Sequence, residues 1–364
     1  MSVVKVAGVG WAQPGGERVS HAELLYRATR RALDSAGLSR DAITSAVTTS
    51  YDYVEGRNLA NQFTLDSIGG TMKPCDLRLS DDGIHSIAAG CAEALAEPGG
   101  VVVVGAVQLG TIELHDDTER AVQETFFEPL YLRPVLSGSS HPEALAFGLA
   151  ARSYFARHGL AEELLAELVC ARSAGAQEER SKREILDSTV VAGPLHEGHL
   201  ARRADAAAVL LLSTDPPSAP LASVRGVGWS ADDAMLTRRE LAEQAPTAAA
   251  AKRAYQAAGV SDPRAEIARA EVYNAYGIDE VMACEALGLA APGEGLDALL
   301  GPANAVNPTG GVQATGWARG AASLLQTARA IEEMAAQPGA LLAAQGWCGL
   351  GACSSAVALF EIAG

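Results

Sequence analysis

The serine that precedes a predicted helix is the first residue whose position suggests chemistry. Ser80 opens the run Ser80-Asp81-Asp82-Gly83, after which a helix is predicted to Leu95. A serine hydroxyl is a weak nucleophile unless a neighbouring base accepts its proton. His85 follows Ser80 by five residues and would not share its helix face, so it is not expected to act as that base. Ser and Asp are preferred helix caps, so we favour a cap at Ser80, supported by Asp81 and Asp82, over a nucleophile.

The cysteines predict neither a metal site nor a set of disulfides. No pair has Cys-x-x-Cys spacing and no Cys/His cluster has the spacing of zinc ligands. The run Gly8-x-Gly10 lacks the third glycine of a dinucleotide-binding loop. We therefore expect buried, reduced thiols in a cytoplasmic protein, without a metal, flavin or nicotinamide cofactor. The six cysteines are Cys75, Cys91, Cys170, Cys284, Cys348 and Cys353.

Composition excludes several classes of protein. The 364 residues carry a formal net charge of −16, so nucleic acid and anionic membrane surfaces are poor partners. An apolar content of 48% excludes a disordered chain. No apolar run reaches the ~20 residues of a membrane span, and the N-terminus has no signal-peptide pattern. We expect a globular protein outside the membrane.

An internal repeat indicates how the chain is organised. The run Gly8-Val9-Gly10-Trp11 recurs as Gly226-Val227-Gly228-Trp229. Each copy precedes an amphipathic helix that is closed by a glycine, Gly37 in the first half and Gly259 in the second. Two matched blocks at nearly equal offsets make a chance match improbable, so the sequence predicts two related halves.

Further elements repeat in the same order. Each half has a helix followed by apolar runs that suit strands covered on both faces, which predicts a layered α/β fold. We place the halves at residues 1–220 and 221–364. A long excursion, about 111–200, contains two predicted helices and is interpreted as a cap inserted in the first half. The predicted helices are 83–95, 142–158, 161–176 and 317–334, and the predicted strands are 101–106, 206–213, 340–345 and 355–362.

Four blocks, in this order and spacing, resemble motifs of the thiolase superfamily. The resemblance implies a double unit of two βαβαβαββ halves with the cap in the first. It is greatest to sterol-carrier-protein-x-type thiolases and to degenerate relatives, including aldolases, that lack the nucleophilic cysteine. The blocks are Ser80 to Gly83 for C-x-S-G, Glu271 to Tyr276 for N-E-A-F or H-D-C-F, Val306 to Gly311 with Gly316 and Gly320 for N-P-x-G-G…G-H-P-x-G, and Cys348 to Gly351 for C-x-G-G.

The sequence departs from the family at its decisive positions. Ser80 stands where the resemblance places the nucleophilic cysteine, and Trp317 stands where it places the activating histidine. Tyr273 replaces the Asn or His that holds a water or the substrate carbonyl, whereas Cys348, an acid/base in the family, is kept. Thiolysis through a cysteine-linked acyl-enzyme is therefore not expected.

The glycine-rich blocks imply contacts to an acyl-CoA thioester. The loop from Cys348 through Gly349 resembles an oxyanion hole, although a glycine turn beside a buried thiol fits equally well. Gly310 and Gly311 are expected to allow a backbone conformation that other residues disfavour and to let the chain approach the thioester closely. Trp317 either fills the space of the absent histidine or stacks on a bulky acyl group.

A stabilised enolate without an acyl nucleophile suits aldol chemistry. The resemblance favours retro-aldol cleavage of a β-hydroxyacyl-CoA, or the reverse, with Tyr273 moving the hydroxyl proton if its pKa is lowered from ~10. Tyr276 is a second candidate, although the family has a core Phe there. The alternatives are a Claisen-type acyltransferase that uses Ser80 as its nucleophile, and a non-catalytic thiolase-like partner subunit.

Partners are also implied by the resemblance alone. Members of the superfamily pair their sheets across a two-fold axis, so a homodimer is expected. Relatives that lack the cysteine bind a small zinc-ribbon/OB-fold protein, which makes such a partner a further expectation. Coenzyme A is expected only as part of the substrate.

Overall fold

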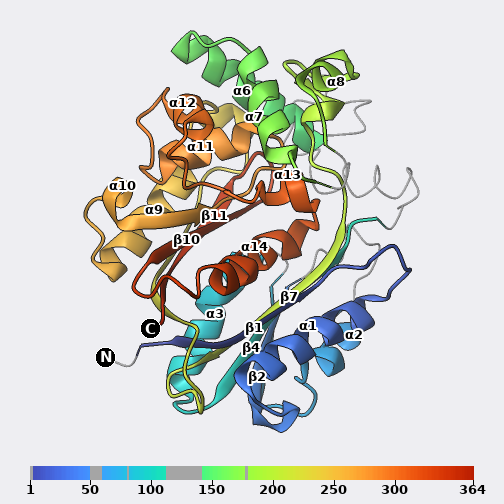
Figure 1. The fold of residues 1–364 in the computed structure, drawn as a ribbon, viewed down its shortest axis with the longest axis vertical. Helices are drawn as coiled ribbons and strands as arrows, with labels where there is room; N and C mark the ends of the chain where they lie inside the picture. Colours follow the sequence, from blue (N-terminus) through green and yellow to red (C-terminus); the bar gives the residue numbers. More distant parts are fainter. Residues whose placement is uncertain (1–2, 50–59, 80–81, 112–141, 177–178) are drawn as a thin grey trace.

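Two related sets of strands form a continuous sheet at the centre of the molecule (Figure 1). The computed structural model describes residues 3–49, 60–79, 82–111, 142–176 and 179–364. In these residues the strand order is β3-β2-β4-β7-β1-β8-β11-β10-β9. The strands are β1 (Lys5–Ala12), β2 (Ile43–Thr49), β3 (Cys75–Leu79), β4 (Val101–Leu109), β7 (Asp205–Ser213), β8 (Ala222–Ala231), β9 (Ile267–Glu271), β10 (Leu341–Cys348) and β11 (Ser354–Ile362), with a separate hairpin of β5 (Val190–Ala192) and β6 (Leu195–His196).

The strand order repeats outward from the central pair β1 and β8. On one side lie β7, β4, β2 and β3, and on the other lie β11, β10 and β9, followed by a parallel bridge from Ala270 to Val306 in place of a fifth strand. Among the described residues, β1 and β8 join the two halves at two paired positions, Lys5 with Ser223 and Val6 with Ala222. The predicted α/β double unit of two βαβαβαββ halves is confirmed, with a bridge in place of one strand in the second half.

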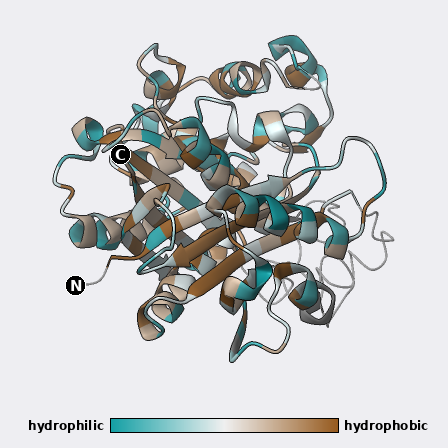
Figure 2. Cartoon of the chain, turned by 60° about the horizontal axis from the view of Figure 1, so that its bottom comes forward, coloured by the Kyte–Doolittle hydropathy of each residue, from teal (hydrophilic) through white to brown (hydrophobic). Residues whose placement is uncertain are grey.

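The helices form layers on both sides of these strands. Helices α3 and α14 lie between the two halves and share one apolar core with strands of both, whereas α1 covers the first half and α9 and α11 cover the second (Figure 1). The central strands are the most hydrophobic part of the chain, and the helices alternate polar and apolar residues (Figure 2). The helices are α1 (His21–Ala36), α2 (Ala60–Ile68), α3 (Gly83–Ala96), α6 (Pro142–His158), α7 (Glu163–Ser173), α8 (Lys182–Asp187), α9 (Ala245–Ala258), α10 (Pro263–Glu266), α11 (Ile278–Ala286), α12 (Gly295–Leu300), α13 (Gly311–Thr315) and α14 (Arg319–Glu333).

The repeated glycines bring a helix onto a strand in each half. A Cβ on Gly10 would lie 2.2 Å from the carbonyl oxygen of Ala28 in α1. A Cβ on Gly228 would lie 2.1 Å from the carbonyl oxygen of Ala250 in α9. Neither position has room for a side chain, so the run Gly-Val-Gly-Trp marks the same helix–strand contact twice.

The cap is attached to the second half by a buried ion pair. Arg172 in α7 donates to Glu280 in α11 at 2.7 Å, and both side chains are buried. Helix α6 has the predicted bounds, whereas α7 is shorter than predicted and α14 begins two residues later than predicted. Residues 112–141 of the predicted cap lie outside the described residues. Among the described helices, none has the length and apolarity needed to cross a bilayer.

The Gly228→Ala substitution tests this helix–strand contact. The added Cβ would overlap the backbone of α9, so we expect a loss of about 1–3 kcal/mol in the free energy of unfolding. Gly15→Ala is the control, because its Cβ would meet only the flexible end of Glu17 at 3.4 Å. Equal thermal midpoints for the two variants would show that α9 moves away without cost.

Candidate active site

A buried aspartate begins the helix that lies between the two halves. Asp82 is the N-cap of α3, and its Oδ1 accepts from the backbone N–H of Ile84 at 3.0 Å and from the hydroxyl of Ser323. Gly83 is the first helical residue, so the residue just before it reaches the free amides. The predicted cap at Ser80 is therefore wrong, and Asp82 caps the helix. Ser80 itself lies outside the described residues.

Asp82 is held against the backbone of the opposite half. A Cβ on Gly346 in β10 would lie 1.8 Å from Asp82 Oδ1. The carboxyl group therefore occupies the space that a side chain at position 346 would need. Burial raises the pKa of Asp82 to about 7, although hydrogen bonds from Ser323 and Ile84 lower it. Asp82 Oδ2 has no hydrogen-bond partner among the described residues.

Tyr273 reaches the same place from the end of β9. Its hydroxyl donates to the carbonyl oxygen of Arg319, and its backbone N–H donates to Oε1 of Gln345 at 3.1 Å. Burial, and next the negative charge of Asp82, raise the pKa of Tyr273 well above its usual value. The condition of a lowered pKa is therefore not met, because burial and the charge of Asp82 both favour the protonated phenol. Tyr273 is a neutral phenol beside a carboxyl group.

The backbone of Tyr273 is positioned by a buried polar cluster. Gln345 Nε2 donates to the hydroxyl oxygens of Ser355 at 3.1 Å and Thr247 at 3.3 Å, which orients its Oε1 toward Tyr273. These side chains come from β10, β11 and α9. Three elements of the second half thus fix the segment that presents the tyrosine.

Aromatic rings pack beside Tyr273. Trp347 lies 5.0 Å from Tyr273 and 6.3 Å from Trp317 between ring centroids, and Tyr276 stacks on Phe147 at 4.5 Å. The structure thus brings Tyr273, Tyr276 and Trp317 together, as the motifs predict. The sequence analysis missed Trp347 and Phe147, although the position of Trp347 directly before Cys348 was a signal that could have found it.

Tyr276 and Trp317 both contact an ion pair that joins the cap to the second half. Glu143 in α6 pairs with Arg319 in α14 and accepts from the Tyr276 hydroxyl at 3.3 Å. The Arg319 guanidinium lies 4.9 Å from the centre of the Trp317 ring. Tyr276 is buried, as the core interpretation expects, but its hydroxyl also contacts this charged pair.

The glycine block lies near the aromatic rings but approaches protein groups. Gly310 and Gly311 have φ values of +88° and +60°, which favour glycine. A Cβ on Gly310 would meet the carbonyl oxygen of Arg172 at 2.2 Å, and a Cβ on Gly311 would meet Asn274 at 2.6 Å. Asn274 accepts from the backbone N–H of Val312 at 2.8 Å. The backbone geometry of Gly310 and Gly311 therefore lets the glycine block pack closely against the segment that carries Tyr273.

Cys348 is the last residue of β10, and its side chain lies on the face of the strand against which Asp82 packs. It stands two residues after Gly346, so its side chain shares the face on which Gly346 meets Asp82. Ser354, its partner in the β10–β11 ladder, lies 3.2 Å from Nε2 of His85 in α3. The thiol is buried. The structure therefore brings Cys348 to the same layer as Asp82, with His85 contacting the neighbouring strand.

The loop after Cys348 is shaped by glycines and an arginine. Gly349 has φ +70°, and its Cβ would lie 2.4 Å from Sγ of Cys353. Arg239 donates to the carbonyl oxygens of Leu350 at 2.6 Å and Gly351 at 3.0 Å. The loop is thus a fixed turn whose carbonyl groups point to Arg239.

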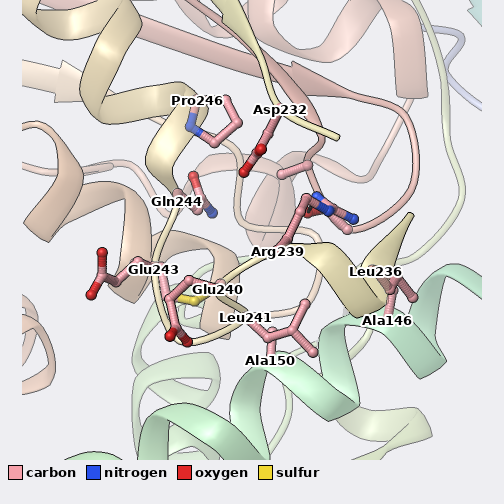
Figure 3. Close-up of a pocket in the computed structure, with 13 residues that line it drawn as sticks. Ala146, Ala150, Asp232, Leu236, Arg239, Glu240, Leu241, Glu243, Gln244 and Pro246 are labelled. Atoms are coloured by element: carbon pink, nitrogen blue, oxygen red, sulfur yellow. Dashed lines mark hydrogen bonds between the residues drawn. The ribbon is translucent and has the colours of Figure 1, made fainter. Parts of the chain in front are cut away.

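A pocket lies on the far side of this loop (Figure 3). It encloses about 340 Å³, including space open to solvent, between α6 and the segment that holds Arg239. Asp232, Glu240 and Glu243 give its lining an acidic character. Gly351, the last residue of the C-x-G-G block, lines it, but none of the candidate catalytic residues does, so we assign the chemistry to the Asp82–Tyr273 region.

Comparison with known proteins supports the fold assignment. Residues 228–350 match the family model described as thiolase C-terminal domain-like. The structure is similar to that of the Ltp2-ChsH2(DUF35) aldolase, with a TM-score of 0.78 and 18% identity, over 99% of this chain and 98% of that one. It is also similar to a monomeric SCP2-thiolase-like protein type 1 from Mycobacterium smegmatis, with a TM-score of 0.72 and 18% identity, over 99% and 77% of the two chains.

Human mitochondrial 3-ketoacyl-CoA thiolase is a third similar structure. Its TM-score is 0.74 at 16% identity, over 100% of this chain and 99% of that one. No curated protein matched the sequence. The chain therefore has the thiolase fold, and the resemblance drawn from its motifs is confirmed. No group of histidine, cysteine and acidic side chains suited to a metal ion occurs among the residues that the structure describes.

The raised pKa of Asp82 predicts a pH-dependent stability. Between about pH 4 and pH 7 the unfolded chain releases the Asp82 proton that the folded chain retains, so this contribution to stability is lost as pH rises through about 7. Asp82→Asn keeps a good N-cap but removes the proton. We expect the thermal midpoint of Asp82→Asn, relative to wild type, to rise between pH 5 and pH 8. A constant difference across this range would contradict the raised pKa.

Proposed function

We propose that this protein is an enzyme that breaks or forms a carbon–carbon bond beside an acyl-CoA thioester, by retro-aldol or aldol chemistry on a β-hydroxyacyl-CoA. The observation that supports this best is that Tyr273 and Asp82 are both buried and lie near enough for the charge of Asp82 to raise the pKa of Tyr273. A phenol and a carboxyl group can exchange the proton of a substrate hydroxyl, whereas neither forms an acyl-enzyme of the thiolase kind. The similar aldolase structure supports the same class.

The proposed reaction has two stages. In the first, the β-hydroxyl proton passes to the oxygen of Tyr273 while the phenol passes its own proton to Asp82, the bond between Cα and Cβ breaks, and its electron pair forms the thioester enolate. In the second, the enolate carbon takes up a proton from the Cys348 thiol; this role is supported by the side chain of Cys348 sharing the face of β10 that meets Asp82. The products are a ketone or aldehyde and a shortened acyl-CoA.

The remaining residues are proposed to shape the substrate site. The turn at Gly349 would present backbone N–H groups to the thioester oxygen. Trp317 and Tyr276, whose rings meet edge to face, would form an aromatic wall for the part of the substrate that leaves as the carbonyl product. Gly310 and Gly311 would hold this wall at its distance from Tyr273 through Asn274.

Assembly is proposed from the same comparisons. One similar aldolase is named as a complex of two proteins, and one similar thiolase-like protein is named as monomeric. We propose a homodimer that a zinc-ribbon/OB-fold protein joins to complete the acyl-CoA site. Light scattering on the purified chain, alone and with that class of protein, tests both parts, and a monomer that binds no such protein would contradict them.

A mass-resolved assay tests the reaction. The purified protein is incubated with panels of β-hydroxyacyl-CoA and β-ketoacyl-CoA, with and without the second protein. We expect cleavage of a β-hydroxyacyl-CoA that falls by about 10²–10⁴-fold in Tyr273→Phe, because the phenol no longer moves the proton. Ser80→Ala should retain the activity.

Two outcomes would replace the proposal. An acyl mass on the wild-type protein that disappears in Ser80→Ala would establish a Claisen-type acyltransferase. Failure to turn over any thioester, together with tight binding to a catalytic protein, would establish a non-catalytic subunit.

A further inference from the structure

We propose that Asp82 is the catalytic base of this site and that it acts through Tyr273, accepting the phenol proton while the phenol oxygen takes the proton of the substrate's β-hydroxyl group. This inference rests on the proposed retro-aldol function and assigns a role to a side chain that the sequence predicted only to support a helix cap at Ser80. Three observations carry it.

The first observation is that one carboxylate oxygen of Asp82 is fixed while the other is unoccupied. Oδ1 accepts from Ile84 N–H and from the Ser323 hydroxyl, and it lies against the backbone of Gly346. Oδ2 is buried and has no partner among the described residues. A buried carboxylate oxygen without a donor is costly, which is unexplained if Asp82 only caps the helix. A proton acceptor needs such an oxygen.

The second observation is that Tyr273 is not itself a base. Burial and the charge of Asp82 hold its pKa well above the usual value, so it is a neutral phenol at pH 7. A phenol can still relay a proton, because its oxygen accepts one as its own hydrogen leaves. The hydrogen now points to the carbonyl oxygen of Arg319, and rotation about the C–O bond is needed to direct it to Asp82.

The third observation is that the environment balances the two protonation states of Asp82. Burial disfavours the carboxylate, whereas the first amides of the 14-residue helix α3 and the Ser323 hydroxyl favour it. The resulting pKa of about 7 leaves both forms populated near neutral pH. This is the range in which a general base works best.

The proposed step conserves protons and electrons. The substrate O–H bond breaks as the Tyr273 oxygen binds that proton, and the Tyr273 O–H bond breaks as Asp82 Oδ2 binds the other. The electron pair left on the substrate oxygen forms the carbonyl bond, and the Cα–Cβ pair becomes the enolate. When the enolate carbon is protonated by Cys348, the Asp82 proton returns through Tyr273 to the site and restores the thiol. No oxidant, reductant or metal takes part.

Other titratable groups near Asp82 bear on its pH dependence. On its own helix, His85 contacts Ser354 of β11. Across the interface lie Cys348 on β10 and Arg319 on α14, the latter paired with Glu143 of the cap. The pH experiment must therefore separate Asp82 from these groups.

Kinetics with Asp82→Asn provide the first test. We expect kcat for β-hydroxyacyl-CoA cleavage to rise with pH through a midpoint near 7 in the wild type. In Asp82→Asn we expect a fall in kcat of about 10²–10⁴-fold, loss of that midpoint, and little change in KM. Ser323→Ala should shift the midpoint upward, because a hydrogen bond that favours the carboxylate is removed. Full activity with an unchanged midpoint in Asp82→Asn would overturn the proposal.

A spectroscopic measurement tests the pair without turnover. Carbon-13 label at Cζ of tyrosine gives eight resonances, and Tyr273→Phe identifies the one from Tyr273. We expect this resonance to shift with a midpoint near pH 7 in the wild type and to lose that step in Asp82→Asn. Glu271→Gln is the matched control, because Glu271 is another buried carboxyl with a pKa of about 7 and is paired with Arg269. It should leave the step in place.

The two measurements separate the proposals. A resonance step without cleavage of any β-hydroxyacyl-CoA would refute the retro-aldol function while retaining the Asp82–Tyr273 pair. Cleavage without the step, or with a step that persists in Asp82→Asn, would refute the role of Asp82 while retaining the function.

Discussion

The burial of one carboxyl group between the two halves constrains the centre of this molecule. Asp82 belongs to the first half, yet Ser323, Gly346 and Tyr273, which it meets, belong to the second. A buried carboxyl group must have hydrogen-bond donors or keep its proton. Helix α3, in the same half as Asp82, supplies the backbone N–H of Ile84. Helix α14, in the other half, supplies the hydroxyl of Ser323. The halves must therefore be docked before this site exists.

A second buried network sets the position of the cap. Arg172 of the cap pairs with Glu280, which also accepts from the side chains of Asn274 and Asn307. Charges this deep are costly to bury, and the carboxylate of Glu280 is satisfied by three hydrogen-bond donors. The same asparagines hold the glycine block and the start of the segment that carries Tyr273. Cap, glycine block and tyrosine are thus one connected unit.

Trp317, which stands where the motif resemblance predicts a histidine, has a packing role in the structure. Its ring lies among Tyr276 and Trp347 and under the guanidinium of Arg319, so the space is used for aromatic packing. Aromatic faces also attract a cation, which helps to explain why the Arg319–Glu143 pair sits at this wall. Trp317 therefore contributes to an aromatic surface beside the phenol of Tyr273.

Local patterns in the sequence determined the fold and most of its elements. The repeated Gly-Val-Gly-Trp run works as a signal because a helix rests on those glycines in each half, and the glycines at 37 and 259 end helices through positive φ. Buried strands such as β4, β7 and β11 were readable as apolar runs. Such features depend on neighbours in the chain.

Tertiary structure alone decided the chemistry of the candidate site. In sequence, Asp82 was one of two acidic residues after Ser80 and Tyr273 was a tyrosine at a motif position. Their pKa values depend on burial and on each other, and they stand 191 positions apart in the chain. The helix cap is Asp82 and not the predicted Ser80, because the first turn of α3 starts at Gly83. Desolvation and contacts between the halves are properties of the folded chain, and no local pattern encodes them.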